Sequence, residues 1–255
     1  MFKKDRLNSK ILRTPEIFVS EMEIVCENKE NCYYIPSPYL DMRIPTSSNL
    51  SIPKSGRYFA EVLKNIDFNG KDVLDVGTGY FGYLARIVEH FGARKVVAVD
   101  INVEAIVCAK KFDNTPKIDF KVSDVYSGIS PGEKFDILIS NPAQLPSNSG
   151  GKVHDFGGKD GLDVIYRIIE GFPKFSKNGG ILYLLVFDFL YDKVRDFCKN
   201  HDLSCDKIGF YDRKIRKGGE TEKRIEYIQS IYEGYRFRTD NGTHYHQVYI
   251  LEIKS

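Results

Sequence analysis

The chain has 255 residues, of which 42% are hydrophobic and 28% are charged, and its formal net charge at pH 7 is +2. This length allows one α/β domain or a domain with a small appendage, and the composition is that of a chain able to bury a core. The small net charge does not by itself indicate a polyanionic partner, and no apolar run is long enough to span a bilayer. The first 16 residues lack the apolar segment of a secretory signal, which favours a cytoplasmic location. The five cysteines are widely spaced, so reduced thiols are expected rather than a zinc site.

Residues 1–53 contain several prolines and no sustained apolar periodicity. They predict an N-terminal extension or cap with a strand or two, such as "CYYIPS" at 32–37. A helix is predicted to begin near Ser55, because apolar residues recur at helical spacing through "GRYFAEVLKNI". We therefore divide the chain into this extension and a main domain over 54–255.

Within the main domain, strand and helix patterns alternate. Strands are predicted at 71–77, 95–101, 118–124, 135–142, 179–187, 205–212 and 245–253. Helices are predicted at 83–92, 103–113, 161–176, 190–202 and 221–233. This alternation predicts an α/β fold with a central, mostly parallel sheet, helices on both faces and right-handed crossovers. In such sheets a ligand binds beyond the carboxyl ends of the strands.

Polar residues and glycines follow four of these strands. "VLDVGTGYFG" at 73–82 contains an acid and a G-x-G-x-x-G pattern, Asp100 and Asp124 end the next two strands, and "NPAQLP" at 141–146 follows the fourth. The glycine pattern alone would also suit a nicotinamide dinucleotide. However, a carboxylate at Asp75 would repel a pyrophosphate and suit an ammonium or sulfonium group, and Asn-Pro has no role in hydride transfer.

The stretches "VLDVGTGYFG", "VVAVDIN", "VSDVY" and "FDILISNPAQLP" resemble, in order and spacing, the motifs of class I S-adenosylmethionine-dependent methyltransferases. The stretch from "NPAQLP" through "DFGGKDGLDVIYRIIEGFPKFSKNGGILYL" resembles the HemK-type, glutamine N-methyltransferase-like branch. The resemblance covers roughly residues 50–190 and the last strand. It implies a Rossmann-like fold with a mostly parallel, seven-stranded sheet and an antiparallel last strand. It also implies S-adenosylmethionine as cofactor and S-adenosylhomocysteine as product.

The resemblance further implies a cofactor site made of Asp75, Gly77, Gly79, Asp100, Ile101, Asp124, Val125 and Asn141. Asp75 would lie near the methionine ammonium, and the glycines would allow close approach of the backbone. Asp100 would hold the ribose hydroxyls, Asp124 would bind the adenine amine, and Val125 would supply a backbone donor. The structural alternative is that these acids cap helices or end strands.

Asn141 and Pro142 are the residues that the resemblance implies for catalysis. In that family the asparagine oxygen and the following backbone carbonyl accept both hydrogens of a planar NH₂ group, whose nitrogen attacks the methyl group. Catalysis then consists mostly of positioning and preorganised electrostatics, and no metal is expected. The structural alternative is a turn that ends the strand.

This sequence departs from the family pattern at two points. Ala143 and Gln144 stand where the branch has proline and an aromatic residue, so a stacking ring is missing; Gln144 could bind a more polar acceptor, or Tyr58 or Tyr80 could supply the ring. Residues 1–53 are also too short and proline-rich for the helical domain that grips release factors. The acceptor is therefore left open between a small molecule and a protein side chain, and the oligomeric state is not predicted.

The remaining features have weaker functional interpretations. His154 could act as a base beside the site or be a solvated loop residue. The stretch "DFGGKDG" at 155–161 is interpreted as a helix-entry turn, with a phosphate-binding nest or a lid hinge as the alternative. His244 and His246 share one face of a strand without an apparent third metal ligand. The basic run at 212–224 is predicted to be an insertion, either a solvated loop, a lid or a nucleic-acid contact. The alternative functions are an RNA or DNA adenine N-methyltransferase, a nicotinamide-dependent oxidoreductase and a non-catalytic scaffold.

Overall fold

The computed structural model describes residues 12–13, 32–36, 41–45, 54–111 and 117–255. Most of the predicted extension, including Cys26, lies outside these residues. The strand predicted within it is confirmed: β2 (Cys32–Pro36) pairs antiparallel with β3 (Asp41–Pro45). A two-residue strand, β1 (Leu12–Arg13), adds to the edge of the main sheet.

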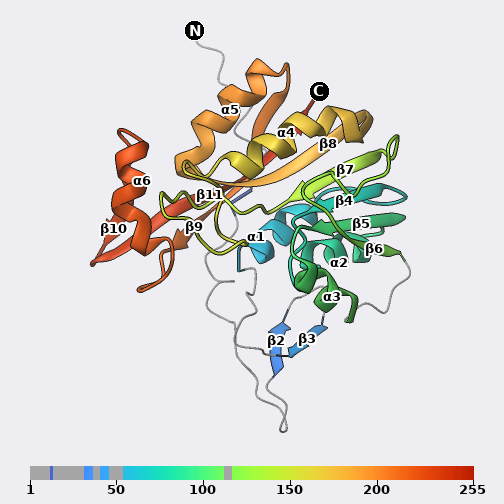
Figure 1. Ribbon diagram of the computed structural model, residues 1–255, viewed down its shortest axis with the longest axis horizontal. Helices are drawn as coiled ribbons and strands as arrows, with labels where there is room; N and C mark the ends of the chain where they lie inside the picture. The colour runs from blue at the N-terminus through green and yellow to red at the C-terminus, as the bar shows by residue number, and fades with distance from the viewer. Residues whose placement is uncertain (1–11, 14–31, 37–40, 46–53, 112–116) are drawn as a thin grey trace.

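The main sheet confirms the predicted α/β architecture (Figure 1). Its strand order is β1-β9-β11-β8-β7-β4-β5-β6, with β10 paired to β11. The strands are β4 (Asp72–Val76), β5 (Lys95–Asp100), β6 (Ile118–Val122), β7 (Phe135–Ser140), β8 (Ser176–Phe187), β9 (Ser204–Lys214), β10 (Arg238–Asp240) and β11 (Thr243–Lys254). All seven predicted strands are present, and the two short strands β1 and β10 raise the number in the described sheet to nine. Strands β4 to β8 are parallel, and β11 is antiparallel to both β8 and β9.

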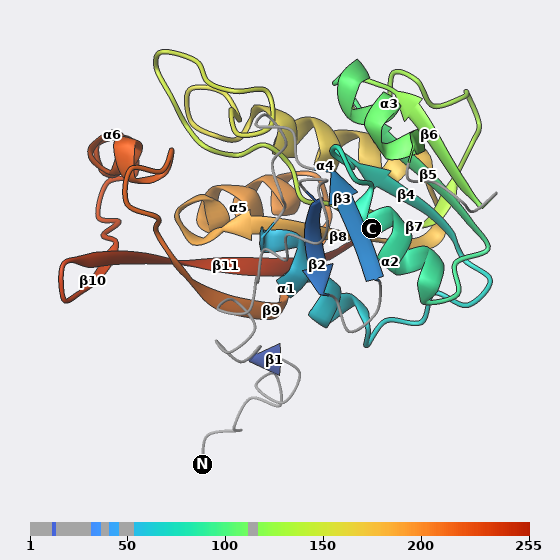
Figure 2. The same cartoon turned by 90° about the horizontal axis from the view of Figure 1, so that it is seen from below.

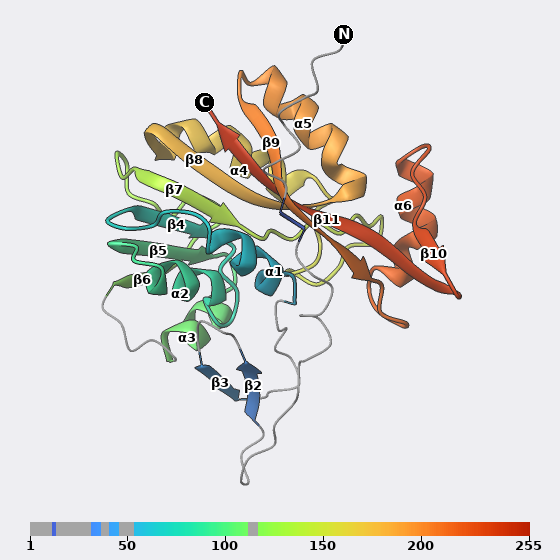
Figure 3. The ribbon, with the colours of Figure 1, turned by 180° about the vertical axis from the view of Figure 1, so that it is seen from behind.

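Helices cover both faces of this sheet, as the alternation predicts. They are α1 (Lys54–Leu63), α2 (Tyr83–His90), α3 (Val103–Lys111), α4 (Asp163–Phe175), α5 (Tyr191–Asn200) and α6 (Ile225–Ile231). Figures 1 and 3 show α4 and α5 on one face and α1, α2 and α3 on the other. Helix α4 illustrates the cause, since Ile165, Ile168, Ile169 and Phe172 are fully buried at helical spacing. No helix in the described part of the chain is long and apolar enough to cross a membrane.

The outer ends of β9 and β11 carry an arm that projects from the sheet (Figure 2). We use "arm" for residues 215–242, which include α6 and β10. The predicted basic insertion at 212–224 therefore begins within β9 and ends in a 3₁₀ turn, Glu222–Arg224, directly before α6. Tyr227 of α6 helps to hold the arm in place, because its hydroxyl donates to the Lys159 carbonyl at 3.0 Å.

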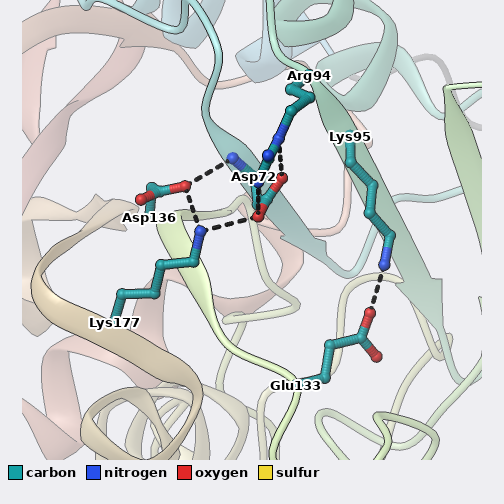
Figure 4. Close-up of polar contacts among 6 residues, drawn as sticks. All are labelled: Asp72, Arg94, Lys95, Glu133, Asp136 and Lys177. Carbon is teal, nitrogen blue, oxygen red and sulfur yellow. Dashed lines mark hydrogen bonds and ion pairs between the residues drawn. The ribbon is translucent and has the colours of Figure 1, made fainter.

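Ion pairs fasten the amino ends of the central strands (Figure 4). They involve Asp72, Arg94, Lys95, Glu133, Asp136 and Lys177. Lys177 Nζ lies 2.8 Å from a carboxylate oxygen of both Asp72 and Asp136. Burial alone would raise the pKa of Asp72, but hydrogen bonds from Arg94 and Lys177 hold it below its usual range. A cavity of about 420 Å³ beside these pairs opens at this amino edge, away from the carboxyl ends of the strands.

Candidate active site

The glycine turn after β4 leaves open space above the backbone. Gly77 and Gly79 have φ angles of 79° and 70°, and a Cβ atom on either would meet no atom within 4 Å. Gly82 is different, because a Cβ there would lie 2.5 Å from the ring of Phe120. The first two glycines thus form a turn that a ligand can approach closely, whereas Gly82 permits packing of α2 on the sheet.

Asp75 lies directly below this turn and is completely buried. Its Oδ2 accepts a hydrogen bond from the Thr78 hydroxyl at 2.6 Å, while Oδ1 has no hydrogen-bond partner in the described part of the chain. Burial and the nearby charge of Asp100 raise the pKa of Asp75 to about 7, whereas the Thr78 hydroxyl and the backbone N–H of Ala85, in the first turn of α2, lower it. A buried carboxylate with an unpaired oxygen is complementary to a cationic ligand group.

Asp100, the last residue of β5, is held against the glycine turn. Its two carboxylate oxygens accept hydrogen bonds from the backbone N–H groups of Gly79 and Asn102, both at 2.9 Å. Burial raises the pKa of Asp100, and these two hydrogen bonds oppose the shift. The next residue, Ile101, has 52% of its surface exposed, so an apolar side chain stands beside the carboxylate at the strand end.

Asp124 and Val125 follow β6. The Asp124 carboxylate forms an ion pair with Arg167 of α4 at 2.8 Å, a contact that the sequence did not indicate. Val125 is buried and has a φ angle of 51°, an unfavourable conformation for a β-branched residue. The hydroxyl of Ser123 donates to the Val125 carbonyl at 2.9 Å and helps to hold this conformation. Backbone strain of this kind is concentrated at functional sites.

Asn141 begins the turn after β7. Its side-chain nitrogen donates to the hydroxyl of Ser55, in the first turn of α1, at 3.0 Å. In the described part of the chain no hydrogen bond reaches the Asn141 Oδ1. The amide therefore has one end anchored and its oxygen available. The sequence missed Ser55 as a site residue, because only the position of α1 brings it to Asn141.

Gln144 has a structural role that the sequence did not predict. Its side chain is buried, its Nε2 donates to the Leu185 carbonyl at 3.1 Å, and its Oε1 accepts from the Phe187 N–H at 2.7 Å. These are the groups that a parallel neighbour strand would bind, and β7 itself stops pairing with β8 at Ser140. The side-chain amide thus replaces a peptide group in the ladder. Its Nε2 also lies 3.3 Å from the Pro142 carbonyl, so we do not retain a contact between Gln144 and the acceptor.

The aromatic residues proposed to replace the missing ring are engaged elsewhere. Tyr58 is buried and its ring stacks on that of Tyr211, with centroids 3.6 Å apart and planes within 6°. The hydroxyl of Tyr80 accepts a hydrogen bond from Asn102 at 3.0 Å. Neither contact leaves an obvious stacking surface for a flat acceptor beside Asn141.

His154, His244 and His246 have different surroundings in the structure. His154 lies in the loop after Gln144, its Nε2 is 3.4 Å from the Asp155 carboxylate, and it is close enough to Asp100 to lower the pKa of that group. His244 contacts Thr239 through Nδ1 at 2.9 Å, and His246 is buried with its Nδ1 3.7 Å from Asp188. Among the described residues no group of three or more metal-ligating side chains gathers.

The carboxyl edge of the sheet thus fits a positively charged nucleoside. The open glycine turn, the Asp100 carboxylate and the unpaired oxygen of Asp75 provide space, acceptors for hydroxyl groups and a partner for a cation. These are the features that the methionine and ribose parts of S-adenosylmethionine require. The residues present therefore fit this cofactor.

Comparisons with known proteins agree with this geometry. The family model described as "Methyltransferase small domain" matches residues 48–210. A Methanocaldococcus jannaschii protein that bears the name of a protein N5-glutamine methyltransferase is 35% identical over 133 residues, which cover 49% of this chain and 66% of that protein. The release factor glutamine methyltransferase of Koribacter versatilis is 32% identical over 142 residues, 51% of each chain. The chain thus spans between about half and 66% of the length of these two relatives.

Among solved structures, a 16S rRNA methyltransferase of T. thermophilus, in complex with AdoMet and guanosine, has the same fold. Its TM-score is 0.55 at 17% identity, over 87% of this chain and 49% of that chain.

Proposed function

The chain belongs to the methyltransferase small domain family, and from this premise we propose that it transfers a methyl group from S-adenosylmethionine to a nitrogen atom of an acceptor. We assign this activity to residues 54–255. When bound, the cofactor supplies a methyl group on a sulfonium, which is already activated for transfer. Asp75 would bind the methionine ammonium, and Asp100 would accept hydrogen bonds from the ribose. Asp124 and Val125 would contact the adenine, with Ile101 packed beside it.

The observation that carries the proposal is the anchored amide of Asn141. Ser55 binds its nitrogen, which presents the oxygen, Oδ1, to a hydrogen-bond donor. The Pro142 carbonyl is the second acceptor, and it has a lone pair beyond the one that faces Gln144 at 3.3 Å. Two fixed acceptors can hold both hydrogens of an NH₂ group and direct its nitrogen lone pair at the methyl carbon. Because these acceptors are in place before the reaction, little reorganisation is needed when charge develops on the nitrogen.

The acceptor that we propose is an aliphatic side-chain amide, such as that of glutamine, in a protein or a small molecule. A nucleobase would need an aromatic surface to stack on. Gln144 provides no ring, and the ring of Tyr58 already lies against Tyr211. The names of the two relatives, both glutamine methyltransferases, support the same acceptor.

The charges of the arm bear on the choice between this acceptor and a nucleic acid. Glu220 pairs with Lys223 and Arg224, and Asp212 pairs with Arg238. Glu220 thus offsets part of the positive charge of Lys223 and Arg224, which weakens the attraction of this end of the basic run for phosphates.

A transfer assay with radiolabelled S-adenosylmethionine tests the proposal. Glutamine-containing peptides and free glutamine are offered beside an adenine-containing oligonucleotide. We expect label on the amide nitrogen, identified by mass spectrometry, and no label on the oligonucleotide. Calorimetry with S-adenosylhomocysteine and NAD tests the cofactor independently, and binding of NAD alone would refute the proposal. Binding of S-adenosylhomocysteine without transfer to any acceptor would favour the scaffold alternative.

A further inference from the structure

Arg57, in α1, has buried donor groups without acceptors. Its Nε and Nη2 are shielded from solvent, and neither has a hydrogen-bond partner in the described part of the chain. A guanidinium carries five N–H donors and a permanent charge, so leaving two donor atoms buried and unpaired is costly. Among the described residues, Arg57 therefore has two donor atoms that an anion would satisfy.

The other arginines of the central domain differ in this respect. Arg86 is a buried residue, and its guanidinium donates to the carbonyls of Phe81 and Ala109, both at 3.0 Å. Arg94 and Arg167 form ion pairs with Asp72 and Asp124. Burial lowers the pKa of Arg57, and among the described residues the groups that oppose this shift are the phenols of Tyr83 and Tyr58.

The position of Arg57 places it between the two halves of the proposed site. Ser55, two residues earlier in α1, contacts the catalytic Asn141. Tyr83 is the first residue of α2, directly after the glycine turn, and α1 packs against α2 (Figure 1). The guanidinium therefore lies on a helix that borders both the Asn-Pro turn and the glycine turn.

We propose that Arg57 binds the carboxylate at the methionine end of S-adenosylmethionine. This inference rests on the proposed function, in which the same end of the cofactor places its ammonium at the unpaired oxygen of Asp75. A zwitterionic amino-acid group needs one anionic and one cationic partner, and these two residues have unpaired atoms of the required kinds. The planar fork of a guanidinium matches the two oxygens of a carboxylate.

The test compares two nucleosides by calorimetry. S-adenosylhomocysteine carries the amino-acid group, whereas 5′-methylthioadenosine has the same adenosine and sulfur without it. We expect Arg57→Gln to lower the affinity for S-adenosylhomocysteine roughly ten- to a hundredfold, the range for a charge-assisted hydrogen bond. The affinity for 5′-methylthioadenosine should stay unchanged. Unchanged binding of the second nucleoside also shows that the variant is folded.

Three further variants serve as controls. Asp100→Asn should lower the affinity for both nucleosides, because both contain the ribose. Lys64→Gln, at the exposed position directly after α1 where Lys64 pairs with Glu61, should weaken the binding of neither nucleoside. Arg57→Lys, which keeps the charge and loses the fork, should recover part of the affinity.

Three outcomes would overturn the inference. The first is unchanged binding of S-adenosylhomocysteine by Arg57→Gln, and the second is an equal loss for both nucleosides. The third is an increase only in the KM of the acceptor, which would assign Arg57 to an anion on the acceptor instead. If the unmodified protein binds neither nucleoside, the proposed function fails as well, so the two failures are distinguishable.

Discussion

The side-chain nitrogen of Asn141 donates a hydrogen bond to the Ser55 hydroxyl at 3.0 Å, across 86 positions of sequence. The first turn of α1 therefore sets the orientation of the amide that ends β7. This contact joins the helix before the glycine turn to the residue that we propose for catalysis. Because the two residues contribute different groups to this contact, substitutions of Ser55 and of Asn141 test their roles separately.

Replacing Ser55 with alanine should slow methyl transfer without affecting cofactor binding. The Asn141 amide would lose one neutral hydrogen bond and could rotate away from its productive orientation, so we expect kcat to fall roughly tenfold. Steady-state kinetics and calorimetry with S-adenosylhomocysteine measure the two effects. Ser204→Ala, at an exposed serine bonded to the Lys254 carbonyl, is the matched control and should behave like the unmodified protein.

Replacing Asn141 with alanine should have a larger effect on the same rate. The variant loses one of two acceptors for the NH₂ group, for which we expect a loss in kcat of about a hundredfold or more. The affinity for S-adenosylhomocysteine should stay within about threefold, since the other cofactor residues are unchanged. Turnover at the original rate would show that the amide does not hold the acceptor.

Cofactor affinity should rise with pH until about pH 7. The pKa of Asp75 is raised to about 7, so below this pH the carboxyl is mostly protonated and must lose its proton to pair with an ammonium. The affinity for S-adenosylhomocysteine should then increase about tenfold per pH unit between pH 5 and 7 and level off above. Calorimetry across this range measures the slope, and Asp75→Asn should bind weakly and lose most of it. A slope that persists in the variant would assign the linkage to another group.

Replacing Gln144 with methionine should destabilise the protein. The variant keeps a similar volume but leaves the Phe187 N–H and the Leu185 carbonyl buried without partners, at a cost of about 2–3 kcal/mol. Urea unfolding measures the change. A stability equal to that of the unmodified protein would mean that the side-chain amide does not complete the ladder. Cofactor affinity measured on the folded variant should change little, because the contacts of Gln144 are with Pro142, Leu185 and Phe187 rather than with the residues proposed to bind the cofactor.

The stability of the fold should decrease below about pH 6.5 because of His246. Burial lowers the pKa of this imidazole in the folded state, although Asp188, 3.7 Å away, opposes the shift, and Arg213 adds to it. As pH falls, the imidazole is therefore protonated in the unfolded chain at a higher pH than in the folded one. Protonation of the unfolded chain favours unfolding, so the stability that the neutral His246 provides is lost below about pH 6.5. Thermal unfolding from pH 8 to 5 should show a smaller decrease for His246→Gln than for the unmodified protein. An identical pH dependence of the two would show that His246 is not held neutral by the fold.

Most of the fold could be predicted from local patterns. The seven strands and the helices after them follow from apolar periodicity and from turn residues, which act over a few positions each. Two short strands, β1 and β10, escaped prediction, because two or three residues give no periodic signal and their pairing depends on neighbours already in place. The family resemblance, carried by four motifs at strand ends, is confirmed by the family match.

The candidate site, like the fold, could be predicted only in part. The sequence by itself determined which groups stand at the strand ends, since Asp75 and Asp100 follow apolar residues directly and Asn141 follows one residue later, after Ser140. Only the tertiary structure decided what these groups contact: Ser55 at the amide of Asn141, Leu185 and Phe187 around Gln144, and the unpaired donors of Arg57. The physical reason is the distance along the chain over which each kind of interaction acts. Secondary structure reflects interactions between near neighbours in the chain, whereas hydrogen-bond satisfaction and burial depend on packing between segments that sequence spacing does not encode.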